Sequence, residues 1–394
     1  MRITIGKPAR GEKFFQRPGI RSKLKEAILD GSNILISAPR RVGKTSILMD
    51  LYDNPIDDYI IVYVDTEALD NEEDFFRRLL EELFDLDLLE KYNHINRKTL
   101  EKLSDFANRI KKVNIPVVGG IEMADQKEET SYDKLVQFLT TTKLDENRIL
   151  ILIDEFPVTI ENIHRTQGID ATKKFLQLNR TIRLNPKFNE KIQFIYTGSI
   201  GLVNVLRRFG VTEDINDLYE FFIDQLTEED GIKFLDTILK EYEIQLSEKV
   251  LTYTIATIEW RIPFYIQSFA REIRNLHETE KEKELDESFI NQGLENVIDN
   301  VNIYLDHYRS RLKRTFTEDQ LKFVFKVLNE ISNKDNLDPS QLPEIAAEFN
   351  VLKDHEYIIS TLEYDGYINN QNDDKLYRFN SPIMKLWWTK YGNK

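Results

Sequence analysis

The chain has 394 residues, of which 41% are hydrophobic and 31% charged, and its formal net charge at pH 7 is −14. This length predicts two or three domains, no apolar run is long enough to span a membrane, and the acidic balance opposes broad affinity for nucleic acid, although not a local basic patch. There is no cysteine, so disulfides and thiolate zinc sites are excluded, and the five histidines are scattered without metal-ligand spacing. The N-terminus lacks the apolar core of a signal peptide, and we expect a cytoplasmic protein with no membrane contact.

The first element is a helical pattern that Gly31 closes, preceded by a basic and polar segment. Phe15 and Arg17 lie in this segment. Two interpretations stay open for them. They form either a surface turn with a packed aromatic ring or one wall of a nucleotide-base pocket.

The next stretch predicts a phosphate-binding loop between a strand and a helix. An apolar β-type run, Ile34 to Ile36, leads into a tight loop that ends in Gly43-Lys44-Thr45, and an apolar helical pattern follows. Backbone N–H groups at a helix start surround a polyphosphate, and the helix dipole favours the negative charge. Lys44 supplies a charge to the β and γ phosphates, and the Thr45 hydroxyl holds Mg²⁺. The expected cradle is Ala38, Pro39, Arg40, Arg41, Val42, Gly43, Lys44, Thr45 and Ser46.

One residue of this loop departs from the consensus G-x-x-x-x-G-K-[ST]. Ala38 stands where the first glycine is expected. Alanine resists positive φ but is the smallest replacement, and we interpret it as a tolerated variant. The alternative is an ordinary strand–turn–helix that happens to contain Gly-Lys-Thr.

Tyr59 to Val64 predicts a second buried strand, followed by a helix whose start resembles a capping box formed by Asp70 and Glu73. Residues 85–147 are less legible. They contain charged helices, a short β-like piece at 115–118, and a further helix with Leu135, Val136 and Leu139.

Arg148 to Phe156 is the second decisive stretch, because five apolar residues in a row end in two acids. Carboxylates at a buried strand tip are costly unless they have partners or a role. Asp154 fits the organisation of Mg²⁺, and Glu155 fits the residue that orients and deprotonates an attacking water. The alternative is an exposed strand end with solvated acids.

A fourth strand, Ile192 to Tyr196, ends in Thr197-Gly198-Ser199. The Ser199 hydroxyl would lie within reach of a γ-phosphate, or it would cap the following helix, and the two roles are compatible. Arg207 and Arg208 end that helix. They are either a solvated basic pair or an arginine finger for the nucleotide of a neighbouring subunit.

The remainder of the chain is mostly helical. Tyr219 to Ile223 predicts a fifth strand, Thr227 with Asp230 caps a helix, and Pro263 fits a helix start after the break at Trp260. From Thr317 onward, three helices and a polar hairpin describe a winged helix. Its third helix carries Lys353 among the acids Asp354, Glu356 and Glu363, so a protein contact is favoured over DNA. The Trp387-Trp388 pair predicts a packing helix.

The order of these motifs resembles the archaeal-type ATPases of the STAND branch of P-loop NTPases, which are related to AAA+ and origin-recognition proteins. The resemblance rests on Arg-Arg-Val-Gly-Lys-Thr-Ser, on Asp154-Glu155-Phe156 and on Tyr196-Thr197-Gly198-Ser199, followed by a helical lid and a winged helix. It covers most of the chain.

This resemblance implies an α/β core with a parallel sheet in the order 5-1-4-3-2. It implies that Lys44 and Thr45 are the Walker A pair, Asp154 and Glu155 the Walker B pair, and Ser199 the sensor-1 residue. Phe15 and Arg17 would match the family's segment near the base, although Gln16 replaces its glycine. Pro263 would match the lid proline that packs on adenine, but Trp260 and Arg261 stand where the family has small residues, which leaves Arg261 open as a phosphate sensor.

We therefore expect three domains, namely an ATPase core at 1–224, a helical lid at 225–312 and a winged helix at 313–394. The expected activity is slow, Mg²⁺-dependent hydrolysis of ATP to ADP and phosphate. The nucleotide state would control oligomerisation or an unidentified protein partner. The alternatives are a DNA-associated ATPase of the replication, transposition or loader kind, and a degenerate ATPase that binds nucleotide only structurally.

Overall fold

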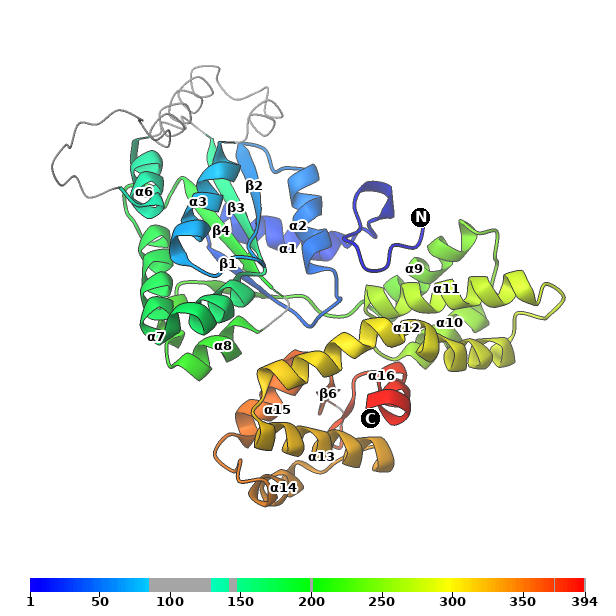
Figure 1. Ribbon diagram of the computed structural model, residues 1–394. Coiled ribbons are helices and arrows are strands. Elements are labelled where there is room, and N and C mark those ends of the chain that lie inside the picture. Colours follow the sequence, from blue (N-terminus) through cyan, green and yellow to red (C-terminus); the bar gives the residue numbers. More distant parts are fainter. Residues whose placement is uncertain (85–128, 142–146, 199–200, 372, 393–394) are drawn as a thin grey trace, which may run out of the picture. The chain divides into compact units, whose positions relative to one another are not determined.

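The computed structural model describes residues 1–84, 129–141, 147–198, 201–371 and 373–392 (Figure 1). The chain forms two compact units. One unit holds Arg17–Ser37 and Ile47–Phe222, and the other holds Met1–Gln16, Ala38–Ser46 and Ile223–Lys394. The expected β-like piece at 115–118 lies outside the described residues, and the division into three domains stays a prediction.

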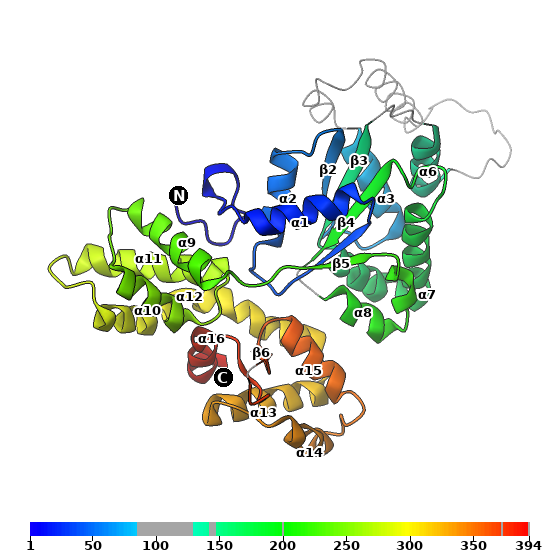
Figure 2. The same ribbon diagram turned by 180° about the vertical axis from the view of Figure 1, so that it is seen from behind.

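The first unit is built on a five-stranded parallel sheet in the order β2-β3-β4-β1-β5 (Figures 1 and 2). This order confirms the expected 5-1-4-3-2 arrangement and the α/β fold class. The inner strands are buried along almost their whole length, as parallel strands covered on both faces must be. The strands are β1 (Ile34–Ser37), β2 (Tyr59–Asp65), β3 (Arg148–Asp154), β4 (Ile192–Thr197) and β5 (Tyr219–Phe222).

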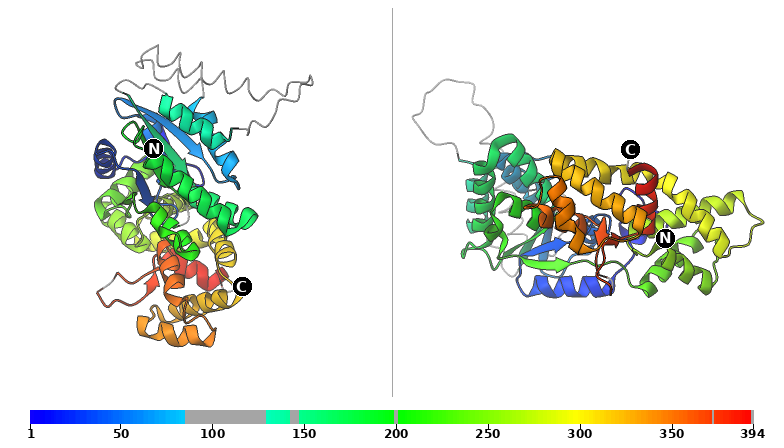
Figure 3. Two further views of the ribbon diagram at one scale, coloured as in Figure 1. Left: turned by 90° about the vertical axis from the view of Figure 1, so that its left-hand side faces the viewer. Right: turned by 90° about the horizontal axis from the view of Figure 1, so that it is seen from below.

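Helices cover both faces of this sheet (Figure 3, left). On one face lie α1 (Pro18–Leu29) and α2 (Lys44–Asp53), whose first turn belongs to the other unit. The opposite face carries α3 (Glu72–Leu83), α6 (Ser131–Thr141), α7 (Phe156–Arg183) and α8 (Leu202–Phe209). The core on this face contains several aromatic rings among aliphatic side chains, and the edge-to-face pair of Phe75 and Phe175 has ring centroids 4.8 Å apart. The short helix η2 (Thr212–Ile215) precedes β5.

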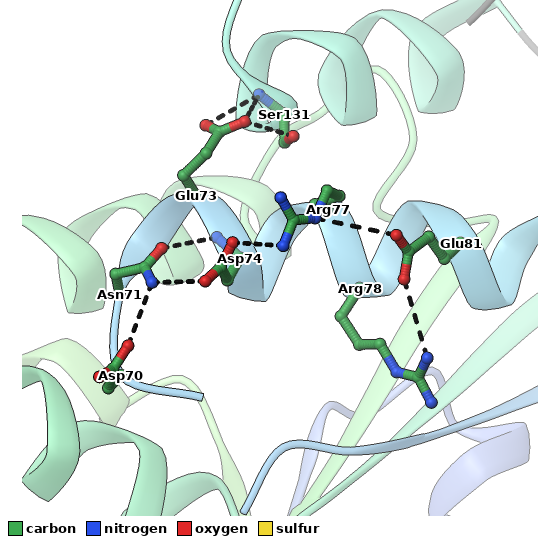
Figure 4. Close-up of polar contacts among 8 residues, drawn as sticks. All are labelled: Asp70, Asn71, Glu73, Asp74, Arg77, Arg78, Glu81 and Ser131. Atoms are coloured by element: carbon green, nitrogen blue, oxygen red, sulfur yellow. Dashed lines mark hydrogen bonds and ion pairs between the residues drawn. The ribbon is translucent and has the colours of Figure 1, made fainter. Parts of the chain in front are cut away.

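The start of α3 differs from the expected capping box. Asn71, not Asp70, caps the helix, because its side-chain oxygen accepts from the backbone N–H of Asp74 at 2.8 Å (Figure 4). The carboxylate of Glu73 instead accepts from the backbone N–H of Ser131 at 3.0 Å and from its hydroxyl, and so caps α6. The expected side chain therefore caps a helix, but the partner is remote in sequence.

The second unit contains a group of four helices, α9 (Glu228–Lys240), α10 (Glu248–Ile258), α11 (Pro263–Thr279) and α12 (Glu287–Thr315). The expected cap of α9 is confirmed, since the Thr227 side chain accepts from the backbone N–H of Asp230 at 3.1 Å. Pro263 is the first residue of α11, as expected. The N-terminal segment, with η1 (Gly11–Lys13), packs on these helices through Phe15, whose ring lies 4.7 Å from that of Phe234.

The last part of this unit has the expected three helices and hairpin. The helices are α13 (Glu318–Lys334), α14 (Leu342–Glu348), after η3 (Pro339–Gln341), and α15 (His355–Tyr364). The antiparallel strands are β6 (Ile368–Asn369) and β7 (Arg378–Phe379), and the chain closes with α16 (Pro382–Trp387) and η4 (Trp388–Gly392). Both tryptophans are fully buried, which confirms their packing role. Within the described residues, no helix is both long and apolar enough to cross a membrane.

Candidate functional site

The loop from β1 to α2 makes its turn with two residues of left-handed backbone. Gly43 has a φ of 97° and Arg41 a φ of 66°. Glycine adopts this conformation at no steric cost, whereas an L-residue such as arginine is strained by about 1–2 kcal/mol. Ala38 is not among the residues with positive φ, so the loop does not need glycine there. The departure of Ala38 from the consensus therefore carries no backbone penalty.

Lys44 is folded onto its own loop. Its side chain is buried, and its Nζ donates to the carbonyls of Ala38 and Pro39, both at 2.8 Å. An ammonium held in this way is already at the loop backbone, where the phosphates are expected. Phosphate oxygens are stronger partners for it than neutral carbonyls, because both groups of that pair are charged.

The same loop contacts the helices of its unit through Arg41. The guanidinium carbon lies 4.3 Å from the ring centroid of Phe264 and 5.4 Å from that of Tyr304, and Nη2 donates to the Tyr304 carbonyl at 3.2 Å. Burial lowers the pKa of Arg41. Because Phe264 follows Pro263, the start of α11 lies beside the β1–α2 loop. On another side, the backbone N–H of Ala9 donates to the Ser46 hydroxyl at 2.9 Å.

A buried ion pair connects α12 with the turn after α15. The Asp365 carboxylate accepts from Nε and Nη2 of Arg311 at 2.6 and 2.9 Å, and both side chains are buried. Burial raises the pKa of Asp365, and the charges of Arg311, Arg40 and Lys44 oppose the shift. Two cations of the β1–α2 loop therefore act electrostatically on this carboxylate.

In the sheet unit, β3 ends at Asp154, which is 3% exposed. Its Oδ2 accepts from the Tyr63 hydroxyl at 3.2 Å, and its Oδ1 accepts from the backbone N–H of Glu155 at 3.1 Å. Its carbonyl accepts from the Thr66 hydroxyl at 2.9 Å. Asp154 is thus a buried, oriented carboxylate, and the alternative of a solvated strand end is wrong for this residue.

Glu155 and Gly198 meet where β3 and β4 end. Glu155 precedes α7 with a φ of 59°, and Pro157 occupies the first turn. A Cβ on Gly198 would lie 2.5 Å from Pro157 Cδ and 3.5 Å from Glu155 Cα. Only glycine fits this approach without displacing the start of α7. No pattern in the sequence identified this role of Gly198.

We expect Gly198→Ala to lower the free energy of unfolding by about 1–3 kcal/mol, since overpacking forces the neighbouring backbone to move. Because the shift displaces Glu155, we also expect ATP turnover to fall by about tenfold or more. Thermal unfolding and single-turnover hydrolysis measure the two effects. Gly19→Ala is the matched control, because a Cβ on Gly19 would meet nothing within 4 Å. Wild-type turnover in Gly198→Ala would contradict the assigned contact.

The remaining candidates are distributed as follows. Ser199 lies outside the described residues, so its sensor role stays a prediction. Arg207 is exposed, and Arg208 pairs with Glu161 at 3.1 Å, and a finger role for either stays a prediction. The packed-aromatic interpretation of Phe15 holds, whereas its contact with a base, like those of Arg17 and Pro263, stays a prediction.

Two residues of the turn before α11 brace the backbone. The Arg261 guanidinium donates to the Leu226 carbonyl at 2.8 Å. The Trp260 indole fills the space beside Gly366, where a Cβ would clash with the ring. This packing accounts for the large residue where the family has small ones. A phosphate-sensing role for Arg261 stays a prediction.

Taken unit by unit, the donors are of the chemical kinds that a nucleotide with Mg²⁺ requires. Lys44 and the backbone amides of a helix start suit phosphates, and the Thr45 hydroxyl and the Asp154 carboxylate are oxygen ligands of the kind that Mg²⁺ takes. Among the described residues, no group of three His, Cys, Asp or Glu side chains is arranged to hold a metal. Mg²⁺ in phosphate sites needs only one or two protein oxygens, because phosphates and water complete its shell.

No protein-family model matches the sequence, and no curated protein matches it either. Solved structures do match. The Walker-type ATPase PABY2304 of Pyrococcus abyssi is 16% identical with a TM-score of 0.66, and the match covers 99% of this chain and 100% of that one. The ORC2 protein of Aeropyrum pernix, solved in ADPNP–ADP complexes, is 10% identical with a TM-score of 0.51, covering 96% and 94%. At these identities the similarity establishes the fold alone, which is that of AAA+-like P-loop ATPases.

Proposed function

We propose that this protein is an ATPase that binds ATP with Mg²⁺, hydrolyses it slowly and acts as a molecular switch of the STAND or AAA+ type. Its nucleotide state controls oligomerisation or the binding of a protein partner. The winged-helix region serves as the docking module for that partner. The fold and the two motif loops support the ATPase, and the contacts of Arg41 support the switch.

Each group of the proposed reaction has one task. Lys44 and the loop amides bind and orient the phosphates, and Thr45 and Asp154 hold Mg²⁺, which when bound neutralises phosphate charge. Glu155 orients water and accepts its proton as the oxygen attacks the γ-phosphorus. The ADP–phosphate bond then breaks in line with the attack.

The observation that carries the switch is the position of Arg41. It belongs to the loop that takes the phosphates, and its guanidinium lies on rings of α11 and α12. A ligand shifts a conformational equilibrium only by its differential affinity for the two states. Phosphate binding next to Arg41 changes the charge around this cation, and so acts directly on the contact with Phe264 and Tyr304.

We expect Arg41→Ala to uncouple nucleotide from the helices. In the wild type, ATP with Mg²⁺ should change amide hydrogen exchange in α11 and α12, and in Arg41→Ala this response should be lost while ATP affinity stays within about tenfold, a loss of about one charge-assisted contact. Arg274→Ala is the matched control. It removes a cation–π contact of the same unit, at 4.6 Å from the Tyr242 ring, and should leave the response intact. An unchanged response in Arg41→Ala would contradict the switch.

Charge on the C-terminal module supports a protein partner more than DNA. Asp354 and Glu356 are exposed at the start of α15, and Asp373 and Asp374 are exposed in the hairpin loop. DNA affinity depends on Lys and Arg against phosphates. Asp354, Glu356 and Asp373 repel a phosphate backbone and suit a basic protein surface, whereas Asp374 is paired with Arg378.

A further inference from the structure

We propose that Tyr63 is a positioning residue, which holds the Asp154 carboxylate for Mg²⁺ and thereby sets the affinity of the site for the metal. The inference rests on the proposed function. Tyr63 lies on β2, the strand next to β3, and no sequence motif indicates a role for its hydroxyl.

The pairing of β2 with β3 brings the two side chains together. Asp65 is the register partner of Asp154, and Tyr63 lies two residues earlier on β2. Register partners and alternate residues share one face of a sheet, so Tyr63 lies on the face of Asp154. Its phenol extends along the strand direction to the carboxylate, and the hydroxyl donates to Oδ2 at 3.2 Å.

This hydrogen bond acts together with the backbone N–H of Glu155, which donates to Oδ1 at 3.1 Å. Each carboxylate oxygen therefore has a donor, and rotation of the carboxylate about its Cβ–Cγ bond is restrained. A group that orients a metal ligand in this way raises metal affinity, because less conformational freedom is lost on binding.

The surroundings of Tyr63 favour its neutral phenol, the form that donates a hydrogen bond. Burial raises its pKa, and the negative charges of Asp154 and Asp65 raise it further. The hydroxyl therefore keeps its proton beside the carboxylate. The residue is also the half-buried member of an otherwise buried run from Tyr59 to Val64, so its removal leaves the core contacts of β2 in place.

The test is Tyr63→Phe, which keeps the ring and removes the hydroxyl. Binding of a fluorescent ATP analogue is titrated with Mg²⁺ and repeated in EDTA. We expect the Mg²⁺ concentration at half-saturation to rise by about tenfold, in the range found for lost partners of metal ligands. The metal-free affinity for the analogue should stay within about twofold, because the phosphate loop is unchanged.

Tyr59→Phe is the matched control on the same strand. The Tyr59 hydroxyl bonds the Ile28 carbonyl at 3.1 Å and the Gln193 side chain at 2.8 Å, so its loss should lower the melting temperature and leave the Mg²⁺ titration unchanged. If Tyr63→Phe has the same Mg²⁺ concentration at half-saturation as the wild type, or if both variants shift it equally, the inference is overturned and the proposed function is not. A wild-type protein that binds no ATP analogue at any Mg²⁺ concentration would overturn the proposed function, and the inference with it.

Discussion

Replacing Lys44 with alanine is expected to lower the affinity for ATP by about 10²- to 10⁴-fold. The ammonium is held at the loop by the carbonyls of Ala38 and Pro39. We expect ATP to replace these partners with β- and γ-phosphate oxygens. Each charge-assisted hydrogen bond is worth about 1.5–3 kcal/mol, and two such bonds give about 3–6 kcal/mol, which corresponds to that range of affinity.

Isothermal titration with ATP and Mg²⁺ measures the loss. Lys25→Ala is a suitable control, because this lysine is exposed on α1. The Lys25→Ala variant should bind ATP as the wild type does. Retained ATP binding by Lys44→Ala would remove the phosphate-binding role from this loop. Thermal unfolding without nucleotide separates the effect on ATP from any effect on the fold.

Glu155→Gln is expected to bind ATP normally and to lose turnover by about 10²- to 10⁴-fold, the usual contribution of a general base. The amide cannot accept the proton of the attacking water. It does keep the shape of the side chain and the N–H that orients Asp154. The variant should therefore accumulate in the ATP-bound state.

Binding and single-turnover hydrolysis, measured on the same preparation, test this separation. Glu161→Gln changes a glutamate of α7, the helix that Glu155 precedes, to the same amide, and it should turn over as the wild type does. Hydrolysis at the wild-type rate in Glu155→Gln would refute the role of Glu155 as general base.

Most strands of the sheet could be predicted from the sequence, because buried parallel strands have continuous apolar runs. The runs at Ile34, Arg148 and Ile192 became β1, β3 and β4, and the acids after the second run lie at its end. The strand order came from the resemblance to archaeal ATPases, since periodicity carries no information on which strands pair. The sheet order confirms it.

The sequence could not predict contacts between residues that are far apart in the chain and that only folding brings together. Tyr63 and Asp154 are 91 residues apart, and Arg41 and Tyr304 are 263 apart. Glu73 reads as a local cap until Ser131 is placed beside it. Gly198 looks like any glycine after a strand, and its necessity arises only from the position of Pro157.

The indole of Trp260 packs on Gly366 and so connects two turns of the chain. Trp260 lies in the turn before α11, and Gly366 lies in the turn after α15. The second residue of α11 is Phe264, whose ring contacts the Arg41 guanidinium of the β1–α2 loop. The indole occupies the space that a Cβ on Gly366 would need, so the two turns pack directly against each other. In the proposed switch, a partner protein bound to the C-terminal helices would act on the bound nucleotide through this contact. Binding free energies are reciprocal: the factor by which ATP changes the affinity for the partner is also the factor by which the partner changes the affinity for ATP.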